Sequence, residues 1–93
     1  MKPKDQLNIK FPLVLVVWKD AQSSAEWEDV GEVEKWAAKD YVVRDIGWII
    51  HENKKHIVIC SQIGDEGGFG NKTKIPIGWV ISKKKLTFKI ERK

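Results

Sequence analysis

Three side chains between residues 51 and 60 are of types that bind metal ions or act as nucleophiles. His51 and His56 flank a short polar turn, and Cys60 follows four residues later. If Asn53-Lys54 forms a two-residue turn, the imidazoles face each other across a hairpin, and both can protonate near pH ~6.5. Zinc usually takes three or four protein ligands, and Cys60 lies about two side-chain steps from His56. We therefore expect no metal site and no cofactor. The histidines are interpreted as a pair near the exposed end of a hairpin, which could be pH-sensitive if it were repeated around a ring of subunits.

The glycine-rich segment 64–73 resembles a phosphate-binding loop but departs from its spacing. A P-loop has four residues between its glycines, followed by Lys and Ser or Thr at the start of a helix. Here five residues separate Gly64 from Gly70, and Asn71 precedes Lys72. Pro76 follows too soon for the required helix to form. The segment is interpreted as a loop between strands that binds no nucleotide.

Catalysis by a nucleophile also lacks support in the sequence. Cys60 lies in the middle of an apolar run with no positioned His and acid, and a buried cysteine is usually structural. The serines lie in expected loops, and the carboxylates of residues 26–34 belong to an expected solvated segment. We predict that the chain is not an enzyme, although a site formed between subunits stays open as an alternative.

Lysines near an exposed aromatic residue form the remaining candidate site. Such lysines neutralise phosphates without reading sequence, and an exposed ring can stack on a base. The alternative is that the lysines keep strand edges soluble and that the ring anchors its own loop. The residues predicted to bind nucleic acid are Lys54, Lys55, Phe69, Lys72 and Lys74.

Charge is distributed unevenly along the 93 residues, although the net charge is only +4. Residues 1–19 carry +3, residues 20–52 carry −6 and residues 53–93 carry +7. An acidic middle and basic ends can attract a polyanion or pair with copies of the same chain. A single cysteine and the lack of an apolar run of about 18 residues favour a reducing, cytoplasmic location away from membranes.

The first half of the chain predicts one strand and a long connection. Residues 11–18 are almost continuously apolar, which is typical of a strand covered on both faces. Ser23 or Ser24 could cap a helix of one or two turns, followed by irregular chain up to Asp40. Two tryptophans of this connection, Trp27 and Trp36, could fill a neighbouring subunit.

Residues 42–63 predict a β-hairpin, because two β-branched and aromatic runs flank the polar turn. A two-residue turn at Asn53-Lys54, with Asn53 at positive φ, would pair residues whose numbers sum to 107. The expected core face then carries Ile46, Trp48, Ile50, Ile57 and Ile59. The opposite face carries Gly47, Ile49, Val58 and Cys60. This second face is too apolar to be bare, so a helix, the N-terminal segment or another subunit should cover it.

The last third of the chain predicts two more strands. One runs from Lys72 to Ile75, and residues 76–79 break it before Val80-Ile81 resumes an extended path. Residues 82–85 are expected to form a basic turn, and the alternation from Leu86 to Ile90 predicts the last strand. The expected fold is all-β: a small five-stranded SH3-like or Sm-like barrel over residues 11–93, with a short helix or irregular segment after the first strand. A flexible N-terminal arm, residues 1–10, precedes it.

The chain resembles a family of small Sm-like proteins of cyanophage origin. The matching stretches cover about residues 15–80: 18–23, 27–30, 46–50, 56–59 and 73–78. The resemblance implies an Sm-like barrel that assembles into a cyclic homo-oligomer in the cytoplasm of the host cell. It implies no molecular role. RNA-binding Sm proteins carry an Asp and an Asn in a first motif and Arg-Gly or Lys-Gly in a second. Here the corresponding segments read Glu-Asn-Lys-Lys and Ile-Pro-Ile-Gly, so those residues cannot be transferred.

Two functional hypotheses follow from the sequence. The first is a phage-type Sm-like protein that forms a cyclic homo-oligomer and binds RNA or single-stranded DNA weakly and without sequence specificity. The second is a protein-interaction or structural assembly module that binds no nucleic acid, in which the charges govern assembly and solubility.

Overall fold

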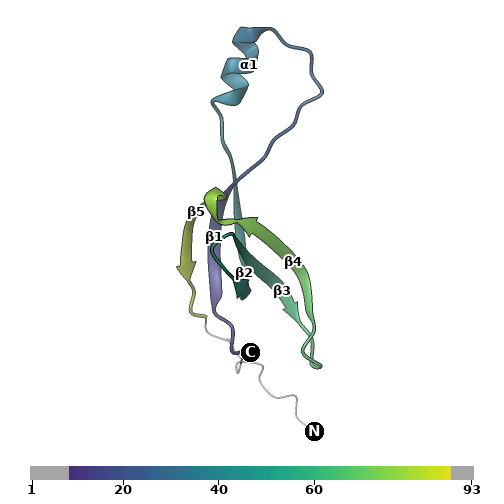
Figure 1. The fold of residues 1–93 in the computed structure, drawn as a ribbon, viewed down its shortest axis with the longest axis vertical. Helices are drawn as coiled ribbons and strands as arrows, with labels where there is room; N and C mark the ends of the chain where they lie inside the picture. The colour runs from purple at the N-terminus through teal and green to yellow at the C-terminus, as the bar shows by residue number, and fades with distance from the viewer. Residues whose placement is uncertain (1–8, 89–93) are drawn as a thin grey trace, which may run out of the picture.

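The computed structural model describes residues 9–88, which form five antiparallel strands in one open sheet (Figure 1). The strands are β1 (Leu13–Asp20), β2 (Tyr41–Glu52), β3 (His56–Ile63), β4 (Phe69–Pro76) and β5 (Val80–Lys85). Their order across the sheet is β4-β3-β2-β1-β5, so β4 and β5 are its edges. Helix α1 (Val30–Ala37) lies between β1 and β2, and the short 3-10 helix η1 (Ile77–Trp79) joins β4 to β5. The expected β-rich fold with five strands and a short helix after the first is confirmed, although the fifth described strand is Val80–Lys85 and not Leu86–Ile90.

The core lies on one face of the sheet, and its buried residues come from β1, β3 and β4. Its buried residues are Val14, Val16, Ile57, Ile59 and Ile75, and Trp18, Ile49 and Val80 pack against them. Trp18 also stacks on Trp79 of η1, with ring centroids 6.4 Å apart, and its indole N–H donates to Asp45 at 2.8 Å. Because strand side chains alternate, the residues between these point to the other side. We call that side the outer face, and on β1 and β2 its apolar members include Leu13, Leu15, Val17, Ile46 and Trp48.

The sheet curls around this core, and two polar contacts tie the β2–β3 turn to the other end of the chain. Lys83 of β5 donates to Glu52 at 2.7 Å. The backbone N–H of Ile77 donates to the carbonyl of Lys55 at 2.8 Å. No hydrogen-bonded pairing joins β4 to β5 within the described residues, so this sheet is open.

The predicted hairpin is confirmed, but its predicted register is wrong. Ile59 pairs with Ile49 instead of Trp48, and Ile57 pairs with Glu52 instead of Ile50. The register shifts between Ile49 and His51, where β2 carries an irregularity. A shift of one residue moves each side chain to the opposite face, because side chains alternate along a strand.

The face assignments change with the register. Ile46 and Trp48, which we expected in the core, lie on the outer face, opposite Leu15 and Leu13 of β1. The expected core positions of Ile57 and Ile59 are confirmed.

The turn itself uses the side chain of Asn53 instead of a positive φ. Asn53 Oδ1 accepts hydrogen bonds from the backbone N–H groups of Lys55 and His56, both at 2.8 Å. The Asn53 N–H donates to the His56 carbonyl at 2.9 Å. Within the described residues, Asn71 of β4 is the non-glycine residue with positive φ, at 51°. The side chain of Asn53 therefore replaces the strained backbone that the sequence suggested.

The segment predicted to be a basic turn is the last described strand. Lys83, Lys84 and Lys85 lie in β5 and pair with Val16, Leu15 and Val14 of β1. Lysine suits an edge strand, because its charge discourages pairing with other chains. Leu86–Phe88 follow β5 without strand structure, and the rest of the predicted last strand lies outside the described residues, as do residues 1–8 of the expected N-terminal arm.

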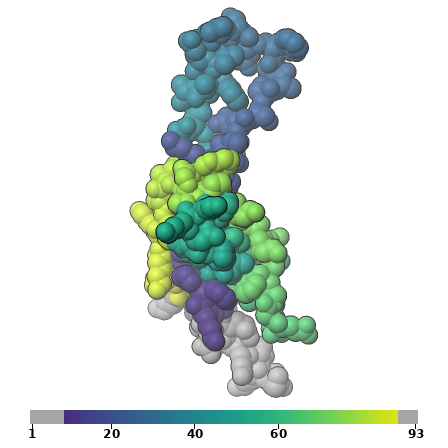
Figure 2. All heavy atoms as spheres, in the orientation of Figure 1, coloured from purple at the N-terminus to yellow at the C-terminus, as the bar shows by residue number. Residues whose placement is uncertain are grey.

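Residues 21–40 form a loop and helix that project away from the sheet, and we call them the helical arm (Figures 1 and 2). The arm leaves the sheet at two paired residues, Asp20 and Tyr41, and Lys19 forms an ion pair with Asp40 there at 3.1 Å. Asp29 caps α1 by accepting from the N–H of Glu32 at 2.8 Å, so the expected serine caps are wrong. The helix follows the irregular chain instead of preceding it. No residue of α1 is buried.

Candidate nucleic-acid interface

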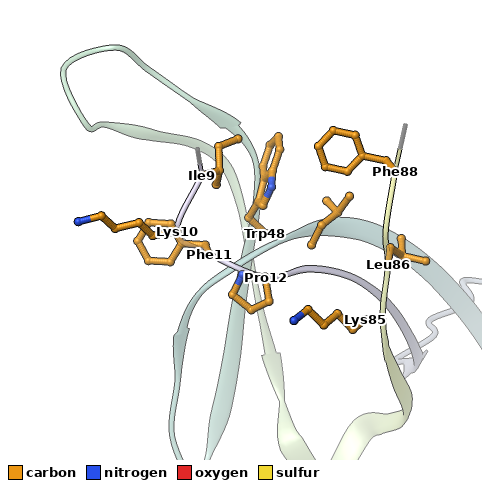
Figure 3. Close-up of a pocket in the computed structure, with 9 residues that line it drawn as sticks. Ile9, Lys10, Phe11, Pro12, Trp48, Lys85, Leu86 and Phe88 are labelled. Carbon is orange, nitrogen blue, oxygen red and sulfur yellow. The ribbon is translucent and has the colours of Figure 1, made fainter. Parts of the chain in front are cut away.

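An open hollow of about 440 Å³, which we call the aromatic groove, lies at one end of the outer face. It is found between the segment that enters β1 and the segment that leaves β5 (Figure 3). It is lined by Ile9, Lys10, Phe11, Pro12, Leu13, Trp48, Lys85, Leu86 and Phe88. Three aromatic rings and two lysines therefore border one concave surface. This combination suits single-stranded nucleic acid, since bases stack on rings and lysines neutralise phosphates.

The pairing of β1 with both of its neighbours builds this hollow. Leu13 pairs with Trp48 of β2, and its carbonyl accepts from the N–H of Leu86 at 2.8 Å. The carbonyl of Pro12 accepts from the N–H of Ile49 at 2.9 Å, which holds the entering segment against β2. The three aromatic residues come from separate parts of the chain, and the sheet brings them together.

Two of the predicted residues extend this surface toward β4. Phe69 packs edge-on against Phe11, with ring centroids 5.4 Å apart. Trp48 pairs with Cys60, and Cys60 pairs with Lys72. Two inter-strand spacings therefore place the Lys72 backbone about 10 Å from that of Trp48 on the same side of the sheet. Phe69 is 37% exposed, so it both anchors its loop and keeps ring surface available to a ligand.

The five predicted residues do not form one compact site. Lys72 and Lys74 are both exposed on the outer side of edge strand β4, where they pair with Cys60 and Val58. Lys54 and Lys55 lie at the hairpin turn, beside Ile77 at the far end of β4 from Phe69. The eight residues from Phe69 to Pro76 span about 23 Å at the usual strand rise. Such a strip suits an extended polymer better than a small anion.

The predicted histidine pair is not formed. His51 pairs with Val58, and His56 pairs with Pro76 of β4. The change of register that moves Ile57 therefore removes the direct cross-strand pairing of the two histidines. His51 Nε2 lies 3.3 Å from the side-chain nitrogen of Asn53, which can donate to it.

Cys60 is buried beneath the outer face, at 1% exposure. Burial raises the pKa of its thiol, and a hydrogen bond from the backbone of Gln62 opposes this shift weakly. A protonated, buried thiol is a poor nucleophile, because the thiolate is the reactive form. Cys60 contributes packing at this position.

Sequence reasoning missed the groove residues Phe11, Trp48, Phe88, Lys10 and Lys85. Trp48 was expected in the core because of the predicted hairpin register, and Phe88 was assigned to a half-buried strand. A register in which Leu13 opposes Trp48 would have revealed the cluster, because the pairs of β1 determine which rings share a face.

Two further observations on residues 9–88 concern metal-binding side chains and membrane-spanning helices. In this part of the chain, no group of three or more His, Cys, Asp or Glu side chains is arranged to hold a metal ion. None of its helices has the length and apolar character needed to cross a membrane.

Comparisons of the chain with protein-family models, with curated proteins and with solved structures find no match.

Proposed function

We propose that this chain is an Sm-like barrel protein that binds single-stranded nucleic acid weakly and without sequence specificity, and that it acts as a cyclic homo-oligomer. The observation that supports binding is the aromatic groove of Phe11, Trp48 and Phe88, bordered by Lys10 and Lys85. Phe69 and the β4 lysines continue this surface along the sheet. The proposed activity is binding, not catalysis.

The Sm-like barrel is proposed from the curled five-stranded sheet and the resemblance described above. The contacts Lys83–Glu52 and Ile77–Lys55 hold β5 and η1 against the β2–β3 turn, which supports a sheet curled over this core. The phage origin and the host-cell cytoplasm belong to the same proposal, since they rest on the resemblance.

Lysine contacts to phosphates predict a steep salt dependence. Each phosphate contact on a single strand adds about 0.7 to the slope of log affinity against log salt. Lysines read no base edge, so different sequences should bind with similar affinity. Stacking on the groove aromatics adds about 1–3 kcal/mol per base without demanding a particular base.

Fluorescence anisotropy of a labelled uridine-rich RNA, at low and near-physiological salt, tests the proposal. The double variant K72E/K74E should weaken binding and lower the salt slope by roughly 1.4. F88A should weaken binding with little change of slope, because it removes a stacking surface. K39E is the matched control, since Lys39 is an exposed lysine on the helical arm.

The predicted residues at the hairpin turn receive their own variant. K54E/K55E should weaken binding if the ligand follows the whole strip along β4. Unchanged binding in this variant would confine the site to the groove and the two β4 lysines. Absence of binding by the wild-type protein at both salt concentrations would overturn the nucleic-acid proposal and favour the assembly module.

A further inference from the structure

The helical arm carries apolar residues that its own chain leaves exposed. Trp27 is 100% exposed, Val30 is 74% exposed and Val33 is 48% exposed. Val30 and Val33 lie three residues apart and therefore share one side of α1. Helices much shorter than about 12 residues are marginal in water without packing. This eight-residue helix therefore needs a partner surface.

The outer face of the sheet, beyond the groove, also carries apolar residues that its own chain leaves exposed. Ile46 is 62% exposed although it lies in the central strand β2, and it pairs with Leu15 of β1. Val17 is the next outer residue along β1. Nothing within residues 9–88 buries Ile46. The sheet thus presents an apolar patch of Leu15, Val17 and Ile46.

Charge distinguishes the two surfaces and makes them complementary. Within residues 26–34 the arm carries five carboxylates and no basic residue. The patch is bordered by Lys84 of β5, which pairs with Leu15, and by Arg44 of β2, which pairs with Val17. Opposite charges around two apolar surfaces favour their encounter and determine their orientation.

In the described conformation, the arm of one chain cannot cover the apolar patch of its own sheet. Figure 1 shows the arm directed away from the sheet. The radius of gyration is 18.0 Å, against roughly 12 Å for a compact chain of this length. The arm is therefore placed to reach another molecule instead of folding back.

We propose that the helical arm of one copy packs its apolar side on the Leu15–Val17–Ile46 patch of a second copy. The contact deepens the proposed homo-oligomer and rests on it. It is heterologous, since different surfaces of the two copies meet, and such contacts produce a ring when the rotation closes. The groove around Trp48 lies further along the outer face and stays available to nucleic acid.

Two full-length variants that each lack one half of the contact test this inference. V30S/V33S removes the apolar side of α1 and keeps the patch. I46E adds a carboxylate to the patch and keeps the arm, and both variants change residues that are exposed in the single chain. Each variant alone should lose the wild-type oligomer and behave as a 10.7 kDa monomer in light scattering. Far-UV circular dichroism and thermal unfolding should show that the sheet remains folded.

Mixing the two variants gives the decisive measurement. I46E supplies an intact arm and V30S/V33S supplies an intact patch, so the mixture should form a 1:1 heterodimer and nothing larger. Contacts between arms would leave I46E oligomeric, which overturns the inference. A mixture that stays monomeric also overturns it.

A charge exchange supplies a second, independent test. E32K/E34K should weaken assembly at least tenfold, and R44E/K84E should do the same. Mixing these two variants should restore assembly, because the basic arm of the first meets the acidic patch of the second, and the unaltered acidic arm of the second meets the unaltered basic patch of the first. Combining all four substitutions in one chain should restore assembly, and failure to do so overturns the orientation proposed here.

The closing comparison separates this inference from the proposed function. A wild-type protein that is monomeric at all concentrations overturns the cyclic oligomer and this contact together. A wild-type oligomer that withstands both I46E and V30S/V33S overturns this contact alone. RNA binding by monomeric I46E should persist, because the substitution lies outside the groove.

Discussion

The sheet and the helical arm use similar apolar residues in opposite environments. Ile57 and Val16 of the sheet are buried to within 1% of their surface, whereas Val30 of the arm is 74% exposed. Burying a Val or Ile side chain stabilises a fold by about 1.5–3 kcal/mol. The sheet obtains this stabilisation within one chain and the arm does not. Residue type alone therefore does not determine which segment buries its apolar side chains within one chain.

The largest expected difference between the two regions is the loss of unfolding free energy when an apolar side chain is shortened to alanine. I57A should lower the free energy of unfolding by about 2–5 kcal/mol, because it leaves a cavity in the core. V30A should change it by less than about 0.5 kcal/mol in the dilute monomer. Urea denaturation followed by circular dichroism measures both. Equal effects would show that the arm packs on its own sheet.

Two glycines give a comparison of intermediate size. A Cβ on Gly47 would lie 2.7 Å from the carbonyl oxygen of Cys60, so G47A must push β2 from β3 and should cost about 1–3 kcal/mol. A Cβ on Gly31 of α1 would meet Asp29 Oδ1 at 3.5 Å, an ordinary contact. G31A should therefore stabilise the helix by about 0.5–1 kcal/mol and so increase the helix content. A destabilised sheet in G31A would contradict the separation of the two regions.

The smallest expected difference concerns the side chains that accept hydrogen bonds from backbone N–H groups. N53A removes the acceptor of two N–H groups in the β2–β3 turn and should lower the unfolding free energy by about 1 kcal/mol. D29A removes the α1 cap and should melt the helix locally without changing the global transition. Helix signal and unfolding midpoint, measured on the same samples, distinguish these outcomes. N53D keeps the acceptor oxygen and is the control for the turn.

The sequence was sufficient to predict four of the five strands and part of the core. The alternation around Ile57 and Ile59 places both residues correctly, and the polar run after Glu52 correctly predicts a turn. The register was not predictable in this way. It depends on the irregularity near His51 and on hydrogen bonds from the Asn53 side chain, and a pattern of period two contains neither.

The β5 strand shows a different limit of sequence reasoning. Three consecutive lysines, Lys83–Lys85, suggest a turn because they show no apolar alternation. They form an edge strand because backbone hydrogen bonds to β1 do not depend on side-chain polarity. The groove was missed for a related reason, since Phe11, Trp48 and Phe88 become neighbours only through the pairing of β1.

The attachment of the helical arm has a consequence for how such a chain can change. Asp20 and Tyr41 are opposite each other at the end of the β1–β2 ladder, so the arm is an insertion into a hairpin that is already closed. Because loop-closure entropy grows slowly with length, the inserted segment can be lengthened, shortened or exchanged at small thermodynamic cost. If the proposed contact forms, its partner can therefore be changed by substitutions within residues 21–40 while the sheet keeps its register.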